Sequence, residues 1–218
     1  MNNIVNNTTT ANVINTSDIV TNRNIVLCGV GGQGTVLASK LLAAAAMSKD
    51  IPVMSAETIG MAQRGGSVVT FVRYGESVAE PIVEEGQADI LIAFERLEAL
   101  RYAHFLKKGG AIIVNDTRID PMPVVIGAAE YPEHILEELS KKYNVLAVDA
   151  TAEALKLGNA RVFNTIILGV AAQHMHFSKE EWLQVIADTV PPKTIDINQK
   201  AFLTGYAYNG NHTEQGQE

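Results

Sequence analysis

The sequence predicts an α/β protein, a three-layer α/β/α fold around a mixed, mostly parallel sheet. Short apolar runs typical of buried strands alternate with segments in which apolar residues recur at helical spacing. The first apolar run leads into a glycine-rich turn and then a helix, the beginning of a βαβ unit. With 218 residues, 47% of them hydrophobic, the chain can form one sizeable core. We expect a single domain over residues 23–208, with disordered tails at 1–22 and 209–218.

The first βαβ unit is expected over residues 24–56. Residues 24–28 form a buried strand, residues 35–49 carry leucine, valine and alanine at helical spacing, and residues 51–56 form a second strand. The β-branched run at 67–74 follows Gly65-Gly66 with no room for a crossover helix. This run should therefore lie antiparallel to a neighbouring strand.

Strands and helices continue to alternate after residue 74. Residues 88–93 and 111–114 are expected to be buried strands, and the helix between them, 96–106, should stop at residues 107–110 (Lys-Lys-Gly-Gly). A short strand at 124–126, a helix at 132–142 and a strand at 144–148 come next. The last helices should begin at Thr151, span about 164–174, begin at Ser178 and span about 199–206.

Two sequence signals mark where helices or loops begin. Ser178 and Glu181 have the spacing of a capping box, and Trp182 behind them should anchor a core or an interface. Asp116 and Asp149 each follow a predicted strand, where an aspartate usually caps the next segment, although Asp116 could also touch a ligand at the edge of the sheet.

The charge and targeting signals exclude several classes of protein. The net charge is −7, and no run of lysine and arginine forms a basic stripe, so a nucleic-acid or anionic-membrane surface is not expected. The first 22 residues are rich in asparagine and threonine and lack the pattern of a secretory signal. Since no apolar run is long enough for a membrane span, we expect a cytoplasmic protein.

The cysteine and histidine content argues against a metal centre in this chain. Cys28 is the only cysteine, and its apolar surroundings predict a buried thiol. One thiol cannot hold an iron–sulfur cluster, so any such cluster must lie in another chain. His174 and His176 are two residues apart in a predicted helix and should point to different faces, so no metal site is expected.

A glycine turn is the first candidate site. Gly29, Gly31 and Gly34 have the G-x-G-x-x-G spacing, which can bring backbone N–H groups and a helix N-terminus to a phosphate. Plain turn geometry selects the same glycines, and both interpretations stay open. Glu57, near the end of the second strand, stands where a dinucleotide fold places an acid on the ribose.

The connection over residues 57–67 is the second candidate site. It is polar and glycine-rich, and in an open α/β sheet it should lie beside the glycine turn, at the carboxyl ends of the strands. Arg64, between Gln63 and Gly65-Gly66, could bind an anion or a partner carboxylate, and Gln63 could bind an amide or a hydroxyl. The alternative is a solvated loop whose glycines only form a turn.

These segments carry a resemblance to a known family. Gly-Val-Gly-Gly-Gln-Gly at 29–34, the 57–67 connection with its Gln-Arg-Gly-Gly, and Arg-Val-Phe-Asn-Thr at 161–165 with Gly169 resemble the gamma-domain family of 2-oxoacid:ferredoxin oxidoreductases. The resemblance covers roughly residues 24–206 and is strongest to the branch that acts on indolepyruvate. Candidate contacts to a ligand or partner are Gly31, Gly32, Gln33, Gly34, Glu57, Gln63, Arg64, Gly65, Gly66 and Asn164. No catalytic acid or base is assigned.

The resemblance implies oxidative decarboxylation of a 2-oxoacid with coenzyme A, giving an acyl-CoA and carbon dioxide while ferredoxin is reduced. It implies that thiamine diphosphate, magnesium and the iron–sulfur clusters belong to a large partner subunit, and that this chain binds none of them alone. Two alternatives remain open: an NAD-dependent dehydrogenase, which the glycine spacing and Glu57 favour, and a purely structural adaptor subunit.

Overall fold

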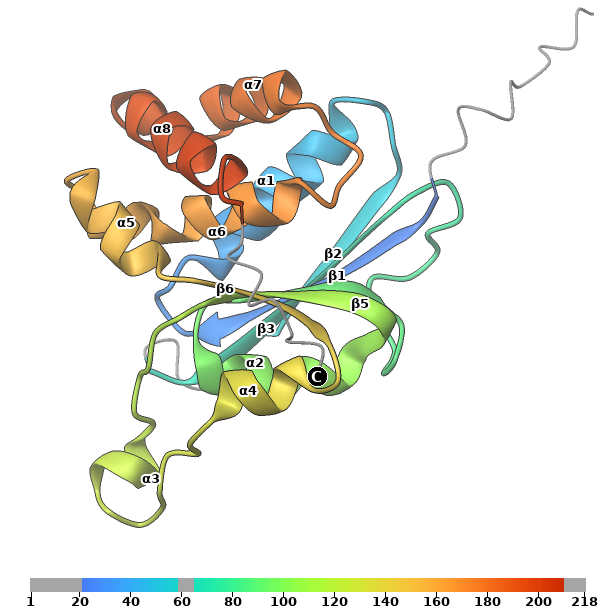
Figure 1. The fold of residues 1–218 in the computed structure, drawn as a ribbon. Helices are drawn as coiled ribbons and strands as arrows, with labels where there is room; N and C mark the ends of the chain where they lie inside the picture. The colour runs from blue at the N-terminus through green and yellow to red at the C-terminus, as the bar shows by residue number, and fades with distance from the viewer. Residues whose placement is uncertain (1–20, 59–64, 210–218) are drawn as a thin grey trace, which may run out of the picture.

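The computed structural model describes residues 21–58 and 65–209, which fold into three layers (Figure 1). The six strands are β1 (Arg23–Val30), β2 (Val53–Thr58), β3 (Ser67–Tyr74), β4 (Ala88–Ala93), β5 (Leu106–Asn115) and β6 (Asn144–Val148). The helices are α1 (Thr35–Met47), α2 (Arg96–Tyr102), α3 (Met122–Val125), α4 (Ile135–Ser140), α5 (Ala150–Lys156), α6 (Phe163–Ala172), α7 (Lys179–Thr189) and α8 (Ile195–Tyr206). The sheet lies between α1, α5, α6, α7 and α8 on one face and α2 and α4 on the other, so the predicted α/β/α architecture is confirmed (Figure 1).

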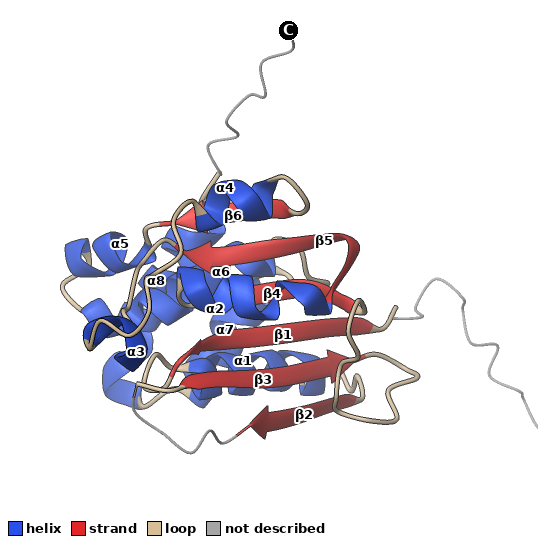
Figure 2. Ribbon diagram, turned by 90° about the horizontal axis from the view of Figure 1, so that it is seen from below, coloured by secondary structure: helices blue, strands red, loops and turns tan. Residues whose placement is uncertain are grey.

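The sheet is mixed, with the strand order β2-β3-β1-β4-β5-β6 (Figure 2). Strands β1, β4, β5 and β6 pair in parallel, whereas β3 pairs antiparallel with both β1 and β2. The antiparallel direction expected for residues 67–74 is therefore confirmed. Because β3 lies between β1 and β2, the two strands of the first βαβ unit are not neighbours in the sheet.

The core lies on both faces of β1, whose side chains alternate between the two helical layers. Ile25 and Leu27 join the cluster under α1 and α6, while Val26 and Cys28 join the cluster under α2 and α4. All four side chains are fully buried, which confirms the expected position of the single thiol.

Helix α7 is anchored as the sequence predicts. The Ser178 hydroxyl accepts a hydrogen bond from the Glu181 N–H, and the Glu181 carboxylate accepts one from the Ser178 N–H, which together form the capping box. Trp182 is fully buried, with its ring centroid 5.6 Å from that of Phe177 and 5.7 Å from that of Phe202. Asp149 caps α5 by accepting from the Ala152 N–H at 2.9 Å, as expected.

Helices α6 and α8 approach each other closely at two glycines. A Cβ added at Gly169 would overlap the carbonyl oxygen of Phe202, and one added at Gly205 would overlap that of Ile166. Backbone atoms of the opposite helix occupy the space of a side chain at both positions. This contact fixes α6, whose first turn holds Asn164, against the rest of the helical layer.

The expected helix stop at residues 107–110 is wrong. A 3₁₀ turn (Ala103–Phe105) ends the helical segment, and β5 begins at Leu106, which pairs with Ala88 of β4. The pairing register shifts between Ala88 and Ile90, and a Cβ on Gly110 would lie only 3.1 Å from the Ala88 carbonyl oxygen. Glycine is therefore used here for close strand packing and not for a helix end.

The expected strand at 124–126 is also wrong, because these residues lie in and just after helix α3. Two prolines fix the backbone at its start, with Pro121 at the N-cap and Pro123 in the first turn. Val125 and Ile126 are 65% and 68% exposed, so no neighbouring strand or core supports an extended conformation.

Two helices have different starts from those predicted. Helix α4 begins at Ile135 because His134 has a positive φ of 56°, a left-handed conformation that cannot continue a helix. Helix α8 begins at Ile195, directly after a 3₁₀ turn that starts at Pro192. The residues expected to form the tails lie, apart from 21, 22 and 209, outside the described residues.

Candidate functional site

The Gln33 side chain holds the glycine turn after β1 in place. The N–H of Val30 donates to Gln33 Oε1 at 2.7 Å, and Gln33 Nε2 donates to the Phe94 carbonyl at 3.0 Å. Gln33 therefore fastens the turn to the end of β4. Its role as a ligand contact stays a prediction.

The two candidate segments meet, as their positions after strands predict. The Gly31 N–H donates to the Gly66 carbonyl at 2.8 Å, and the Gly65 N–H approaches the Gly31 carbonyl at 3.5 Å. Gly65 and Gly66 thus lie directly beside the turn. The candidate contacts Gln63 and Arg64 of the same connection lie outside the described residues.

Asn164 joins the turn from the other end of the sequence. It is the second residue of α6, only 6% exposed, and its amide nitrogen fills the space that a Cβ on Gly34 would occupy. Gly34 is the N-cap of α1 and has a left-handed φ of 89°. The structure therefore brings together the first turns of α1 and α6.

Glu57 lies apart from this group. It is an exposed residue of the edge strand β2, where its carboxylate accepts a hydrogen bond from Ser39 Oγ of α1 at 3.3 Å. Ser39 is one helical turn beyond Thr35, and β3 separates β2 from β1. The acid of a dinucleotide fold follows the strand next to the glycine turn, so the dinucleotide arrangement is not reproduced here.

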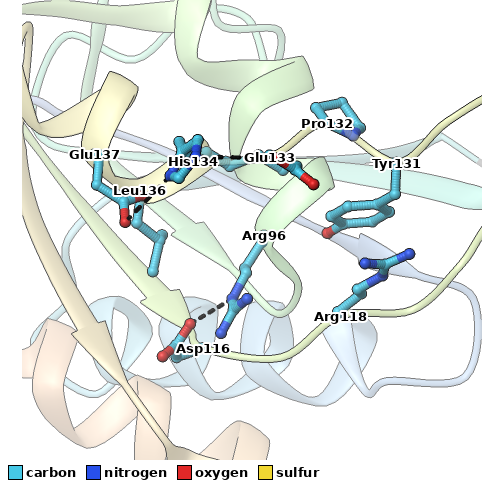
Figure 3. A pocket seen from close by; sticks show the side chains of 10 residues that line it. Arg96, Asp116, Arg118, Tyr131, Pro132, Glu133, His134, Leu136 and Glu137 are labelled. Carbon is cyan, nitrogen blue, oxygen red and sulfur yellow. Dashed lines mark hydrogen bonds and ion pairs between the residues drawn. The ribbon is translucent and has the colours of Figure 1, made fainter.

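A pocket that the sequence analysis missed lies at the ends of β4 and β5 (Figure 3). It has a volume of about 540 Å³, and its wall includes Arg96, Asp116, Arg118, Tyr131 and His134. The Arg96 guanidinium pairs with the Asp116 carboxylate, and the N-cap of the next helix, α3, is Pro121, so the expectation that Asp116 caps the next segment is wrong. A second hollow of about 610 Å³ shares Arg118 and Tyr131 with the first.

Tyr131 and Glu95 hold the pocket wall in place. The Tyr131 hydroxyl donates to Glu95 Oε1 at 2.6 Å, and the Arg118 guanidinium carbon lies 4.3 Å from the centre of the Tyr131 ring. Burial and the neighbouring Glu95 raise the pKa of Tyr131, which stays protonated and a donor. Position was the only sequence signal for this pocket, because Arg96 and Asp116 lie within three residues of the ends of strands β4 and β5, both of which were predicted.

A second buried acid lies behind the glycine turn. Glu98 is 4% exposed and accepts a hydrogen bond from the Ser67 hydroxyl. Burial raises the pKa of Glu98, and burial also raises that of the Cys28 thiol, whose Sγ donates to the Glu98 carbonyl at 3.4 Å. Cys28 is thus an unreactive core residue and not a nucleophile.

The described residues contain neither a metal-binding cluster nor a helix that could cross a membrane. Across residues 21–58 and 65–209, no group of three His, Cys, Asp or Glu side chains is arranged to hold a metal ion. Within the same ranges, no helix has both the length and the apolar character that crossing a membrane requires.

Comparisons with known proteins agree on one family. Residues 24–208 match the family model described as pyruvate ferredoxin/flavodoxin oxidoreductase. The chain is 43% identical over 190 residues to the indolepyruvate oxidoreductase subunit IorB of Thermococcus kodakarensis, covering 84% of this chain and 93% of that protein. It is 44% identical over 188 residues to the IorB subunit of Archaeoglobus fulgidus, with 84% and 93% covered.

The fold is also found among solved structures. The pyruvate oxidoreductase subunit PORC of Thermotoga maritima matches with a TM-score of 0.65 and 24% identity, over 85% of this chain and 95% of that one. The similarity therefore extends over nearly the whole described fold. This chain belongs to the pyruvate ferredoxin/flavodoxin oxidoreductase family.

Proposed function

We propose that this chain is the small subunit of an indolepyruvate ferredoxin oxidoreductase. The complex would oxidatively decarboxylate an aryl pyruvate with coenzyme A to an acyl-CoA and carbon dioxide, and reduce ferredoxin. The observation that carries this proposal is the 43% identity to an IorB subunit over 93% of that subunit's length. Its substrate and its cytoplasmic location stay predictions.

The proposal assigns the electron carriers to a larger partner. Cys28 is the only cysteine of the chain and lies fully buried in the core, whereas a cluster needs several thiolates. We propose that thiamine diphosphate, magnesium and the iron–sulfur clusters are bound by that partner. The residues of this chain would bind and orient substrates and exclude water.

The carboxyl edge of the sheet is the proposed substrate-facing surface. The glycine turn follows β1, and the Arg96 and Arg118 pocket follows β4 and β5 at the same edge. Arg118 is stacked on Tyr131 and its Nε donates to Asp120 Oδ1 at 2.6 Å, but its side chain is 51% exposed, so the remaining guanidinium N–H groups are accessible to phosphate oxygens of coenzyme A. Gln63 and Arg64, which lie outside the described residues, stay proposed contacts to a ligand or partner.

Reconstitution tests the proposal. The purified chain alone should show no oxidation of 2-oxoacids, and adding the larger subunit of the same organism should give indolepyruvate-dependent, coenzyme A-dependent reduction of ferredoxin. Full turnover by the larger subunit alone would contradict the proposal. Replacing indolepyruvate by pyruvate or a branched-chain 2-oxoacid in the same assay identifies the substrate.

Arg118→Ala and Arg64→Ala separate a substrate-binding role from that of a structural adaptor. In the assembled complex, each should raise the KM for coenzyme A about tenfold, the effect of one lost charge-assisted hydrogen bond. Lys200→Ala, an exposed charge on α8, is the matched control and should leave that KM unchanged. Unchanged KM values in both arginine variants would favour an adaptor.

The dehydrogenase alternative has its own test. Because β3 separates Glu57 from the strand that carries the glycine turn, no NAD site is expected. Titration of the isolated chain with NADH, followed by nucleotide fluorescence, should show no saturable binding. Saturation in the micromolar range would favour the dehydrogenase.

A further inference from the structure

The chain between β5 and α4 forms an arm that projects from the domain around the short helix α3 (Figure 1). We call residues 119–130 the α3 arm. Four large apolar side chains of the arm are between 37% and 68% exposed: Ile119, Met122, Val125 and Ile126. No side chain of α3 is buried. Single exposed apolar residues are common on soluble proteins, but a group of them on one short segment is typical of an interaction surface.

One buried carboxylate fastens both ends of the α3 arm. Glu95 is 1% exposed, and its Oε1 accepts from the Ile119 N–H at 3.2 Å and from the Tyr131 hydroxyl at 2.6 Å. Inside the arm, the Pro123 carbonyl accepts from the Ala128 N–H at 2.8 Å. These contacts hold the arm in one conformation, so a partner that binds it has little chain entropy to offset.

A second copy of this chain does not suit the α3 arm. A stable interface buries about 800 Å² on each partner, and four side chains of this size cannot supply that area in a contact between two arms. The two hollows described above are both lined by Arg118 and Glu133, so neither gives an apolar receptor for the arm of a second copy. The arm therefore suits an apolar groove of a different chain, as one part of a larger interface.

The position of the α3 arm indicates which chain that is. The arm follows β5, at the carboxyl edge of the sheet, and its residues Val124 and Ala129 line the second hollow together with Arg118 and Tyr131. The proposed function assigns the reactive cofactors to a larger subunit, so a substrate held at this edge must also be reached by that subunit. A subunit placed over this edge lies against the arm.

We propose that the α3 arm is a docking element that inserts its apolar side chains into an apolar groove of the larger subunit of the oxidoreductase. This inference rests on the proposed function, because that function supplies the larger subunit. Docking buries Met122, Val125 and Ile126, and burial of apolar surface is the main favourable contribution to such an association. It also brings the larger subunit over the hollow that Val124 and Ala129 line.

Association of the full chain with the larger subunit of the same organism, followed by biolayer interferometry, tests the arm. Met122→Asp and Val125→Asp should each weaken binding at least about thirtyfold, because a charge replaces an apolar side chain at the centre of the contact. Since no side chain of α3 is buried, both variants should keep the circular dichroism spectrum and the Tm of the wild type. At saturating concentration, both should restore the wild-type kcat in the reconstituted complex.

Met47→Asp is the matched control. Met47 is 66% exposed, against 68% for Met122, and it is the last residue of α1, at the amino edge of the sheet. The same substitution is thus made away from the arm, and this variant should bind the larger subunit like the wild type. Equal losses of affinity in Met122→Asp and Met47→Asp overturn the proposal, because the effect would then not belong to the arm.

The same measurements distinguish a failure of the arm from a failure of the proposed function. Wild-type affinity in both arm variants overturns the docking role and leaves the proposed function intact. If the wild-type chain does not bind the larger subunit and gives no reconstituted turnover, the proposed function fails and the docking role fails with it. Sedimentation equilibrium of the isolated chain tests the other occupant. A wild-type dimer that Met122→Asp converts to a monomer assigns the arm to a second copy and overturns the proposal.

Discussion

Gly169→Ala tests the close contact that positions helix α6. An alanine Cβ would lie 2.9 Å from the Tyr206 nitrogen and 3.1 Å from the Gly205 Cα, and it would overlap the Phe202 carbonyl oxygen. All three are backbone atoms of α8, which cannot rotate away as a side chain can. The substitution should therefore force α6 and α8 apart.

Two opposing effects set the magnitude. Alanine is favoured over glycine inside a helix by about 1 kcal/mol. Overpacking costs about 1–3 kcal/mol, and a clash with backbone belongs at the upper end of that range. We expect a net loss of about 2 kcal/mol, which for a domain of this size lowers the Tm by about 4–8 °C.

Thermal unfolding followed by far-ultraviolet circular dichroism measures the effect. Lys200→Ala changes an exposed position of the same helix α8 and should shift the Tm by no more than about 2 °C. A Gly169→Ala protein that melts above the wild type would refute the reasoning, because helix propensity would then outweigh the steric contact.

Three further predictions concern buried groups. Glu95→Ala should lower the free energy of unfolding, measured by urea titration, by about 3 kcal/mol, because the Tyr131 hydroxyl and two backbone N–H groups lose their acceptor. A loss below about 1 kcal/mol would contradict the role of Glu95 as their shared acceptor. Burial raises the pKa of the Cys28 thiol, so this thiol should react with an aromatic disulfide reagent at least about 100-fold more slowly in the folded protein than in urea. Equal rates would show an accessible thiol. Burial raises the pKa of Glu98, so this side chain binds more protons in the folded than in the unfolded state, and its contribution to stability falls as pH rises above 4.5. Urea titrations above pH 4.5 should therefore show that the free energy of unfolding of the wild type falls relative to that of Glu98→Gln as pH rises; a constant difference would exclude Glu98 as the cause.

The sequence predicts the framework of the fold well because the strands carry a strong local signal. Residues 88–93 are buried along their whole length, as a continuous apolar run predicts. The antiparallel β3 also follows from sequence, since residues 59–66 are too few for a crossover helix. Strand order was not predicted, because pairing between distant strands leaves no periodic pattern in either one.

Local signals fail where tertiary contacts or proline chemistry decide the conformation. The β-branched residues at 124–126 favour a strand, but they project from the domain without a neighbouring strand, and prolines start a short helix. Gly109 and Gly110 resemble a helix stop, yet Gly110 serves a close approach of β5 to β4.

The candidate site was predicted in part. Glycine spacing located the turn, and the positions of the segments after strands predicted the contact between Gly31 and Gly66. The pocket with Arg118 and Tyr131 was missed because it depends on a contact between two residues 13 positions apart, on either side of the short helix α3, and such a contact has no sequence signature. Whether the candidate residues touch a ligand stays a prediction.

Trp182 gives the protein a built-in optical probe. It is the only tryptophan of the chain, and it lies in α7 against the rings of Phe177 and Phe202. Its indole N–H has no hydrogen-bond partner among the described residues. Such an apolar environment should give a blue-shifted emission, which should move to longer wavelength when the layer formed by α1, α5, α6, α7 and α8 opens. Fluorescence of the purified chain can therefore follow the opening of that layer without any attached dye.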